Sequence, residues 1–401
     1  MSSPGPAKEP YTGALARAIA DVVEPGAAEV DATGSFPRKQ IDALADAGIL
    51  GLTVPAGLGG GGAGLREAAT VARELGAVCG STAMIVTMHY AATAALAAAA
   101  AAAESAGMPA DIAAIALADI AAGRHLSTLA FSESGSRSHF WAPLGTAVLA
   151  GDADGTAVRL DASKSWVTSA GQADSYVWSS RPLAAAGPMT LWLVPARADG
   201  LSAAGAFDGL GLRGNASAPM SADGLLVPLA AMLGDDGAGL DVALAAVLPV
   251  FLIGSASMSA GLMGRLTAET AGHLQRTQLR HLGQSLAQQA QPRAQLARLR
   301  IEADRTRALV EETLTAVEQG RPDAQLLVLE VKAAAGEAAA DAADLALRAG
   351  GGAAFRKESP VERLFRDSRA ARVMAPTTEA LYDFIGRALC GLPLLDAGDE
   401  S

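Results

Sequence analysis

The stretch from Phe131 to Pro143, FSESGSRSHFWAP, gathers hydroxyl, carboxylate, guanidinium, imidazole and indole groups within one short segment. Backbone N–H groups, hydroxyls and a guanidinium in one loop can hold an anion such as a phosphate. Taken alone, however, the stretch favours a polar surface turn around a buried tryptophan. The rest of the chain changes that interpretation.

Two of the five histidines are candidates for proton exchange, because histidine changes charge near neutral pH. His139 lies in the same polar stretch, where its alternative role is to face a phosphate. His89 lies among Met and Ala in an apolar helical pattern, where a hydrogen-bonded core histidine is the alternative. Tyr90, the next residue, is a further polar group that could line a substrate pocket.

Composition excludes several classes of function for this 401-residue chain. Its net charge of −11 argues against a general nucleic-acid binder. Cys79 and Cys390 are far apart, which predicts a reducing compartment with neither a disulfide framework nor a metal site. The run Ala91–Ala103 lacks the Leu, Ile and Phe of a membrane span and predicts a packed helix. The first residues lack a secretory signal, so we expect a cytoplasmic protein without membrane contact.

Hydrophobic periodicity divides the chain into three parts and predicts an α+β protein. Residues 1–126 show helical spacing, with the glycine-rich loop GLTVPAGLGGGGAGL between helices. Residues 127–236 alternate and are rich in Val, Thr, Trp and Tyr, with GDADG as a hairpin turn, so they predict a small β domain. Residues 237–401 are helical again and predict a four-helix-type bundle. Its expected helices end at Gly320 and at Gly350–Gly352, and a last helix starts near Pro376 and Thr377.

This order of domains, together with four motifs, resembles the acyl-CoA dehydrogenase superfamily from about residue 11 to residue 392. The polar loop resembles the family's Thr-Glu-Pro-x-Ala-Gly-Ser-Asp motif, and the resemblance implies that Phe131, Ser132 and Ser138 contact the flavin, with Ser138 also near the substrate. Arg137 and His139 replace the Gly and Asp of the motif. The loop is therefore expected to present a different face to the substrate.

The remaining motifs imply further contacts by the same resemblance. KSWVTSA resembles the family's Lys-x-Trp-Ile-Thr-Asn-Gly strand, so Trp166 is expected to flank the flavin ring and Thr168 to lie near its N5. LGLRGNASAPM resembles the turn that leaves the β domain, and Arg213 there is a candidate substrate contact or, equally, a structural ion-pair residue.

The strongest match is RAGGGAAFRKESPVERLFRDSRAARVMAPTTEAL. The resemblance places Arg348, Gly351 and Gly352 against the cofactor of a neighbouring subunit, and Thr377 and Thr378 against the flavin. It also implies a homotetramer or homodimer.

The departures from the family pattern bear on function. The glutamate that abstracts the α-proton of an acyl thioester is Ala375 here, and the following glycine is Pro376. The alternative position of that base, on an earlier helix, offers only Asp241 at the helix start. Arg348 replaces a glutamine, and Arg280 is one residue out of register with the family's Arg-x-x-Phe-Gly. FMN, or reduced flavin supplied by a partner reductase, is therefore an alternative to FAD.

Three functions follow from these residues. The first is a flavin-dependent oxidoreductase that oxidises an acyl-CoA or related small substrate without the usual glutamate, paired with an electron-transfer partner. The second is a reduced-flavin-dependent monooxygenase of the same fold, which hydroxylates nitrogen, sulfur or carbon and needs no α-proton base. The third is a non-catalytic homologue. In the first two, His89 and His139 are the candidate catalytic residues.

Overall fold

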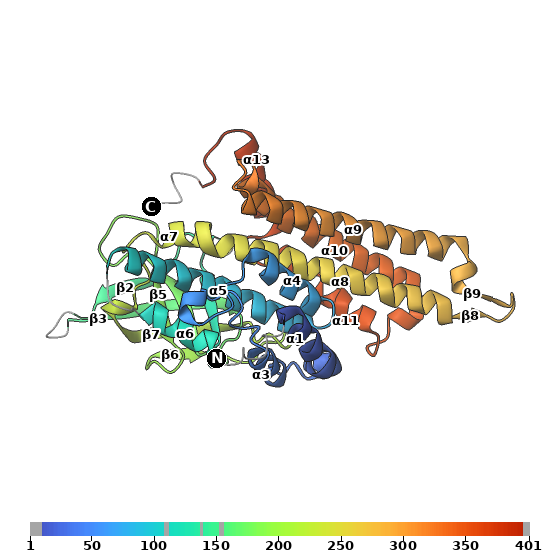
Figure 1. Cartoon of the computed structure of the whole chain (residues 1–401), viewed down its shortest axis with the longest axis horizontal. Coiled ribbons are helices and arrows are strands. Elements are labelled where there is room, and N and C mark those ends of the chain that lie inside the picture. The colour runs from blue at the N-terminus through green and yellow to red at the C-terminus, as the bar shows by residue number, and fades with distance from the viewer. Residues whose placement is uncertain (1–9, 108–111, 137–138, 152–155, 396–401) are drawn as a thin grey trace, which may run out of the picture.

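The computed structural model describes residues 10–107, 112–136, 139–151 and 156–395. The molecule is elongated. The strands of residues 127–228 gather at one end, a small two-stranded hairpin lies at the other end, and long helices form the rest (Figure 1). This arrangement confirms the α+β class and the helical, β, helical order predicted from periodicity. The predicted domain boundaries remain predictions, although the first strand begins at Ser127 and the helices resume at Gly239.

The N-terminal region is helical, as its spacing predicts. It contains α1 (Tyr11–Ala18), the π-helical turn η1 (Ile19–Val23), α2 (Glu24–Thr33), α3 (Arg38–Asp46), the 3₁₀ turn η2 (Ala56–Leu58), α4 (Leu65–Gly76), α5 (Gly80–Ser105) and α6 (Ile112–Ala121). The alanine run forms the second half of α5, where small side chains let neighbouring helices approach closely. Two helices, α5 and the run Gly239–Arg276, are long and apolar enough to cross a membrane, but most of each is buried inside the fold, as in core helices.

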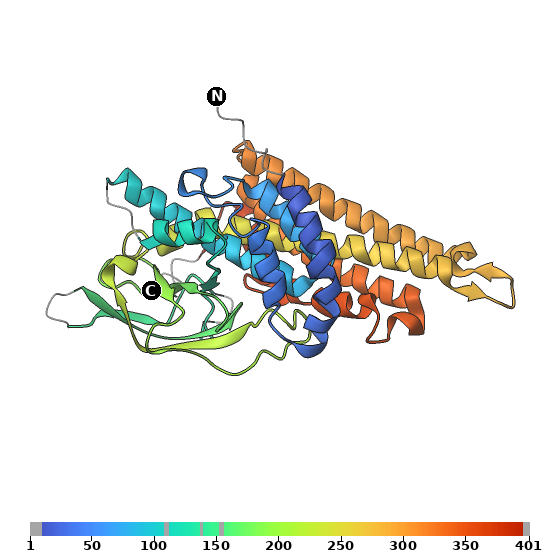
Figure 2. The same cartoon turned by 60° about the horizontal axis from the view of Figure 1, so that its bottom comes forward.

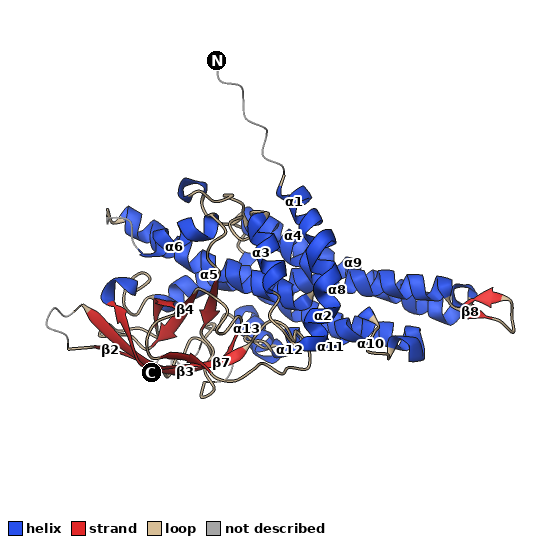
Figure 3. Ribbon diagram, turned by 90° about the horizontal axis from the view of Figure 1, so that it is seen from below, coloured by secondary structure: helices blue, strands red, loops and turns tan. Residues whose placement is uncertain are grey.

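Two sheets form the middle region, which Figure 3 shows as red strands beside α5 and α6. One sheet has the order β1-β4-β5 and the other the order β2-β3-β7-β6. β1 is parallel to β4, and the other pairs are antiparallel. The strands are β1 (Ser127–Ala130), β2 (Thr146–Leu149), β3 (Ala157–Val167), β4 (Ser175–Ser180), β5 (Thr190–Pro195), β6 (Leu201–Ala203) and β7 (Ala218–Pro228), followed by the 3₁₀ turn η3 (Leu229–Ala231).

Burial explains the strand patterns. β7 alternates between buried and exposed residues, since only one face of its sheet packs on the core. β4 is buried along its whole length, between β1 and β5. β2 and β3 pair as the hairpin that the sequence predicted, while residues 152–155 of the GDADG turn lie outside the described residues.

The C-terminal region is a bundle built on three long helices, which Figure 2 shows running away from the strands. α7 (Gly239–Val242), the π turn η4 (Ala243–Val247) and α8 (Leu248–Arg276) form one continuous helix. A small hairpin that the sequence analysis missed, β8 (Gln278–Leu279) and β9 (Gln284–Ser285), leads through the 3₁₀ turn η5 (Leu286–Gln288) to the rest. There follow α9 (Ala290–Glu318), α10 (Ala324–Ala354), α11 (Pro360–Asp367), α12 (Ala370–Val373) and α13 (Thr378–Leu389).

Local chemistry sets the ends of these helices. α9 stops before Gly320, whose φ of 60° suits glycine. Thr377 caps α13, because its side-chain oxygen accepts the Ala380 N–H at 3.3 Å. The predicted helix end at Gly350–Gly352 coincides with a break in α10. The chain breaks helical geometry at Gly351 (φ 55°, ψ −145°) and then continues to Ala354.

Candidate active site

A cleft opens where the N-terminal helices, the sheets and the bundle meet, and we call it the central cleft. Its empty volume is about 540 Å³, part of it open to solvent. The central cleft is lined by Met88 of α5, Leu129 of β1, Phe131, Ser132 and Phe140 of the polar loop, Ser165 and Trp166 of β3, Ala243 and Val247 of η4, Leu248 and Phe251 of α8, and Ala375 and Pro376.

Trp166, which the sequence predicts to flank the flavin ring, lies on the wall of this cleft. Its side chain is 71% exposed, although tryptophan is usually well covered in folded proteins. The β3–β7 register is irregular between Lys164 and Val167, and Trp166 has a φ of 55° there. A bulge of this kind re-aims a side chain, so the indole faces the cleft instead of following the alternation of the strand.

A buried ion pair holds the polar loop against β3. The Lys164 ammonium donates to the Glu133 carboxylate at 2.6 Å, and both side chains are almost fully buried. Glu133 also accepts the backbone N–H of Leu144 at 2.7 Å. Burial lowers the pKa of Lys164 to about 8, while Glu133 opposes that shift. The pair fixes the loop beside the strand, since the Ser165 N–H also donates to the Ser132 carbonyl at 2.9 Å.

The walls of the central cleft carry no titratable group among the described residues. Its polar side chains are the hydroxyls of Ser132 and Ser165, and the rest is apolar or aromatic. Ala375, which the resemblance predicts to stand in place of the family's proton-abstracting glutamate, lies on the wall. Asp241, the other candidate acid, is exposed and does not line the cleft. The described part of the cleft therefore contains no side chain able to remove an α-proton.

The structure places His89 in the core and not in the cleft. Its Nε2–H donates to the Leu50 carbonyl at 3.1 Å, and its Nδ1 accepts the Ser127 N–H at 3.1 Å, which fixes a neutral tautomer. Burial lowers its pKa to about 4. The ring is fully buried and both nitrogens are occupied, which argues against the predicted catalytic role.

Tyr90 is likewise a core residue. Its hydroxyl donates to the Ile49 carbonyl at 2.6 Å, and burial raises its pKa. The prediction that it lines the substrate pocket is not supported. Met88 is the α5 residue that lines the cleft, because neighbouring residues on a helix point about 100° apart.

His139 remains close to the site. It is exposed, its Nδ1 lies 3.0 Å from the Ser136 carbonyl, and its ring packs edge-on against Trp141 at 4.9 Å. Its neighbour Phe140 lines the cleft. Ser138, predicted to contact both flavin and substrate, lies outside the described residues.

Two other residues, predicted to contact the flavin or the substrate, form hydrogen bonds or ion pairs within the protein. Thr168 is buried, and its hydroxyl lies 3.1 Å from the Ser217 hydroxyl. Arg213 donates to the Asp31 carbonyl at 2.8 Å and pairs with Asp208 at 3.3 Å. Neither residue lines the central cleft. For Arg213, the structural alternative fits these bonds better than the substrate contact.

The family model of the acyl-CoA dehydrogenase N-terminal domain matches residues 10–106, and the model of the C-terminal domain matches residues 237–390. The chain belongs to the acyl-CoA dehydrogenase family. It is thus a member of a family of flavoprotein oxidoreductases, as the motifs predicted.

Several proteins resemble the chain over nearly its whole length. Acryloyl-CoA reductase (NADH) of Anaerotignum propionicum is 26% identical over 369 residues, covering 91% of this chain and 90% of the relative. Butyryl-CoA dehydrogenase of Megasphaera elsdenii has a TM-score of 0.85 at 20% identity, over 96% of this chain and 100% of that one. KijD3, solved with FMN and dTDP-3-amino-2,3,6-trideoxy-4-keto-3-methyl-D-glucose, has a TM-score of 0.83 at 22% identity, over 99% and 98% of the two chains. At these identities, the two structures show a shared fold alone.

The acyl-CoA dehydrogenase motif at α13 has features of a ligand contact. Thr378 is buried, and its hydroxyl has no hydrogen-bond partner among the described residues. It is the first residue of a twelve-residue helix whose N-terminal amides favour an anion or an electron-rich ring edge. Thr377 is occupied as the cap. Thr378 does not line the central cleft, so its contact with the flavin stays a prediction.

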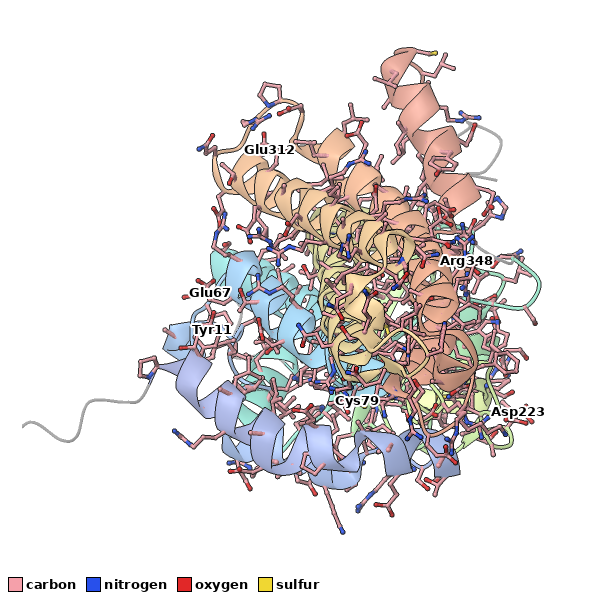
Figure 4. The ribbon with its side chains drawn as sticks, turned by 90° about the vertical axis from the view of Figure 1, so that its right-hand side faces the viewer. Tyr11, Glu67, Cys79, Asp223, Glu312 and Arg348 are labelled. Carbon is pink, nitrogen blue, oxygen red and sulfur yellow. The ribbon has the colours of Figure 1, made fainter. Side chains whose placement is uncertain are left out.

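The family's paired glycines lie far from the central cleft of the same chain. Arg348 pairs with Asp344 at 3.0 Å and is 61% exposed on α10, where Figure 4 labels it. Gly350 lines a second, polar pocket of about 790 Å³ with Thr270, His273 and Arg276. That pocket is roughly 30 Å along α8 from the cleft. Gly351 and Gly352 are also exposed, and their contact with the cofactor of a neighbouring subunit stays a prediction.

Sequence reasoning missed most of the apolar lining. Met88, Leu129, Val247 and Phe251 carry no chemical signal, and only packing brings them together. One sign of a functional site is visible only in the structure. The π turn η4 supplies Ala243 and Val247, and such turns within α-helices often occur at functional sites.

Proposed function

We propose that this protein is a flavin-dependent oxidoreductase that oxidises a small, partly apolar substrate by a route that needs no side-chain base at the usual position, namely reduced-flavin-dependent monooxygenation. The observation that carries the proposal is Ala375 on the wall of a cleft without a titratable lining residue in the described chain. Oxygen transfer to nitrogen, sulfur or carbon needs no α-proton removal, whereas acyl-thioester dehydrogenation does.

The residues present fit a bound flavin. Trp166 offers an exposed aromatic face, and Ser132 and Ser165 offer hydroxyls in the cleft. When bound, the flavin would supply the electron-accepting ring and, once reduced, the reaction with dioxygen. Trp166 would orient the ring by stacking, and the hydroxyls would hold its polar edge.

The apolar lining would bind the substrate and exclude water. Phe140, Leu248 and Phe251 give the cleft a surface suited to an apolar group, and Ser132 adds a polar contact in the same cleft. His139, at the exposed side of the same loop, is the remaining candidate for proton exchange with the substrate. These assignments support a small substrate without fixing its class.

FAD is the cofactor that we propose, with FMN and diffusible reduced flavin as alternatives. The polar pocket beside Gly350 could take the far end of a dinucleotide bound by a neighbouring subunit, as the family motif implies. That use requires a homodimer or homotetramer. Exposed apolar side chains on α12 and α13, among them Val373 and Leu389, are suited to such contacts. A flavin reductase would supply the electrons, in the cytoplasm.

Acyl-CoA dehydrogenation is the second candidate, favoured by the relative that is an acryloyl-CoA reductase. In that case an electron-transfer partner would take the place of the flavin reductase. A base would then have to come from His139, from residues outside the described chain, or from the substrate itself.

Anaerobic titration of the flavin-loaded protein separates the two candidates. We expect butyryl-CoA, octanoyl-CoA and palmitoyl-CoA to leave the flavin absorbance unchanged. The photoreduced protein, mixed with air in a stopped-flow cell, should reoxidise in two phases. Bleaching by an acyl-CoA would refute monooxygenation as the main reaction, and a purified protein that binds neither FAD nor FMN would favour the non-catalytic homologue.

A further inference from the structure

Two described lysines are buried, and both hold a wall of the central cleft. Lys164 holds the polar loop through Glu133, so its charge is compensated at 2.6 Å. Lys332, in the middle of α10, is 1% exposed and bonds only to backbone carbonyls. No carboxylate lies within ion-pair distance of its ammonium in the described structure.

The carbonyls that Lys332 engages all belong to one segment. Its Nζ donates to Ala371 at 3.0 Å, to Met374 at 3.1 Å and to Pro376 at 2.8 Å. An ammonium has three N–H donors, so each is used once. Ala371 lies in the four-residue helix α12, and Met374 and Pro376 lie in the irregular connection to α13, so regular helix bonds do not satisfy these carbonyls. Lys332 therefore determines where Ala375 and Pro376 stand on the cleft wall.

The charge of Lys332 has nothing close to oppose it. Glu379, in the exposed first turn of α13, is the carboxylate that acts on it at longer range. Burial lowers the pKa of Lys332 to about 7, which agrees with an ammonium that lacks a partner. The cleft wall beside it contains no acid in the described chain, and a positive charge in such surroundings acts strongly on whatever occupies the cleft.

We propose that Lys332 is a positioning residue of the central cleft, which fixes the Ala375–Pro376 wall through three carbonyls and places an uncompensated positive charge one peptide group behind it. This inference rests on the proposed flavin-dependent function. A reduced flavin carries a negative charge that an oxidised flavin lacks. Lys332 therefore strengthens the binding of the reduced form relative to the oxidised form.

Three variants test this role in the full-length protein. Lys332→Met removes the charge and the donors but keeps the length of the chain. Glu379→Gln removes the opposing charge and leaves the three carbonyl bonds in place. Lys357→Met removes an exposed lysine and serves as the control. The readout is the midpoint potential of bound FAD, measured below the Lys332 pKa of about 7 so that the ammonium carries its charge. This potential gives the ratio of affinities for reduced and oxidised flavin.

We expect Lys332→Met to lower that ratio about tenfold, which for a two-electron couple is about 30 mV. Glu379→Gln should raise the ratio by a smaller factor, and Lys357→Met should leave it unchanged. Hydrogen exchange of residues 372–378 should accelerate in Lys332→Met alone. An unchanged potential in Lys332→Met, or shifts of the same sign in both variants, would overturn the inference.

The outcomes distinguish this inference from the proposed function. If the wild type binds FAD and the Lys332→Met potential does not move, the inference alone fails. If the wild type binds no flavin, the proposed function fails, and the proposed effect of the Lys332 charge fails as well. If Lys332→Met does not fold, the sign of the Glu379→Gln shift decides, because that variant leaves the carbonyl bonds intact.

Discussion

At the scale of single residues, the chemistry of this site is defined by which side chains reach the cleft. His89 and Tyr90 are the more reactive types on α5, yet Met88 lines the cleft. The two polar side chains instead tie α5 to Ile49, Leu50 and the start of β1. Ala375, the predicted place of the family's base, also lines the cleft.

His89→Gln should weaken the fold and leave the reaction's pH dependence unchanged. An amide can replace only one of the two ring hydrogen bonds, so we expect a loss of about 1–3 kcal/mol in the free energy of unfolding. The matched variant His139→Gln, at an exposed position, should keep its stability and lower turnover. Denaturant unfolding measures the effect on stability, and a pH–rate profile measures the effect on the reaction. A shifted limb of the profile in His89→Gln would support the catalytic role predicted for His89.

The sign of the pH effect at His89 follows from its depressed pKa. Between about pH 6.5 and about pH 4, His89 binds a proton in the unfolded chain but not in the folded protein. Stability is therefore lost as the pH falls through this window, by up to about 3 kcal/mol. The His89→Gln variant should not show this loss of stability as the pH falls.

Ala375→Glu should introduce acyl-CoA dehydrogenase activity. A carboxylate at this position would enter the wall of the central cleft, within reach of a bound substrate. We expect anaerobic octanoyl-CoA to bleach the flavin slowly in this variant and not in the wild type. Ala375→Gln, of the same shape but without a base, is the control. Equal bleaching in both variants would show that the carboxylate is not responsible.

At the scale of elements, the Glu133–Lys164 pair determines how the polar loop meets β3. Lys164 also donates to the Ser179 carbonyl of β4 at 2.7 Å, and its ammonium lies 5.3 Å from the centre of the Trp178 ring. One buried cation thus connects the loop to both sheets. Ser132 and Trp166 reach the cleft from the two elements that this pair joins.

Breaking this pair on one side should be costly. Glu133→Gln or Lys164→Met alone should destabilise the protein by roughly 3–5 kcal/mol, because each leaves a buried charge or donor without its partner. The double variant should lose less free energy of unfolding than the two single variants lose together. Urea unfolding of the wild type and three variants gives the coupling energy, and additive losses would mean that the two side chains act independently.

At the scale of the whole molecule, charged groups join all three regions near the end of α11. Arg366 of α11 pairs with Asp31 of α2 at 2.6 Å and with Glu362. Asp367 accepts the Leu212 N–H, on the turn that leaves the β region, at 2.7 Å. Burial raises the pKa of Asp367 to about 6, and nearby Asp31 adds to this shift.

Asp367→Asn should flatten the pH dependence of stability. The folded protein binds a proton at Asp367 between about pH 4 and about pH 6 that the unfolded chain has released, so stability falls as the pH rises through this window. The amide keeps an acceptor for Leu212 and has no charge to bury. We expect the difference in unfolding free energy between variant and wild type to change by about 3 kcal/mol across the window. A constant difference would mean that Asp367 is already ionised throughout.

The sequence by itself determined the class of fold and the family, and it predicted the position of the missing base. Helical spacing, strand alternation and capping residues such as Thr377 are local, since each depends on neighbours within a few positions. Trp166 and Ala375 could be placed at the site because motifs fix them relative to their own strand or loop. Ser132 could be placed for the same reason.

Only the tertiary structure decided which side chains face the cleft and which charges are partnered. α5 is apolar on every side, so its sequence contains no period from which to tell that Met88 lines the cleft and His89 is buried. Lys332 finds its three carbonyls in a segment about forty residues further along the chain, and no local rule relates them. Hydrogen bonds and burial at such separations arise from packing, which depends on the whole chain at once.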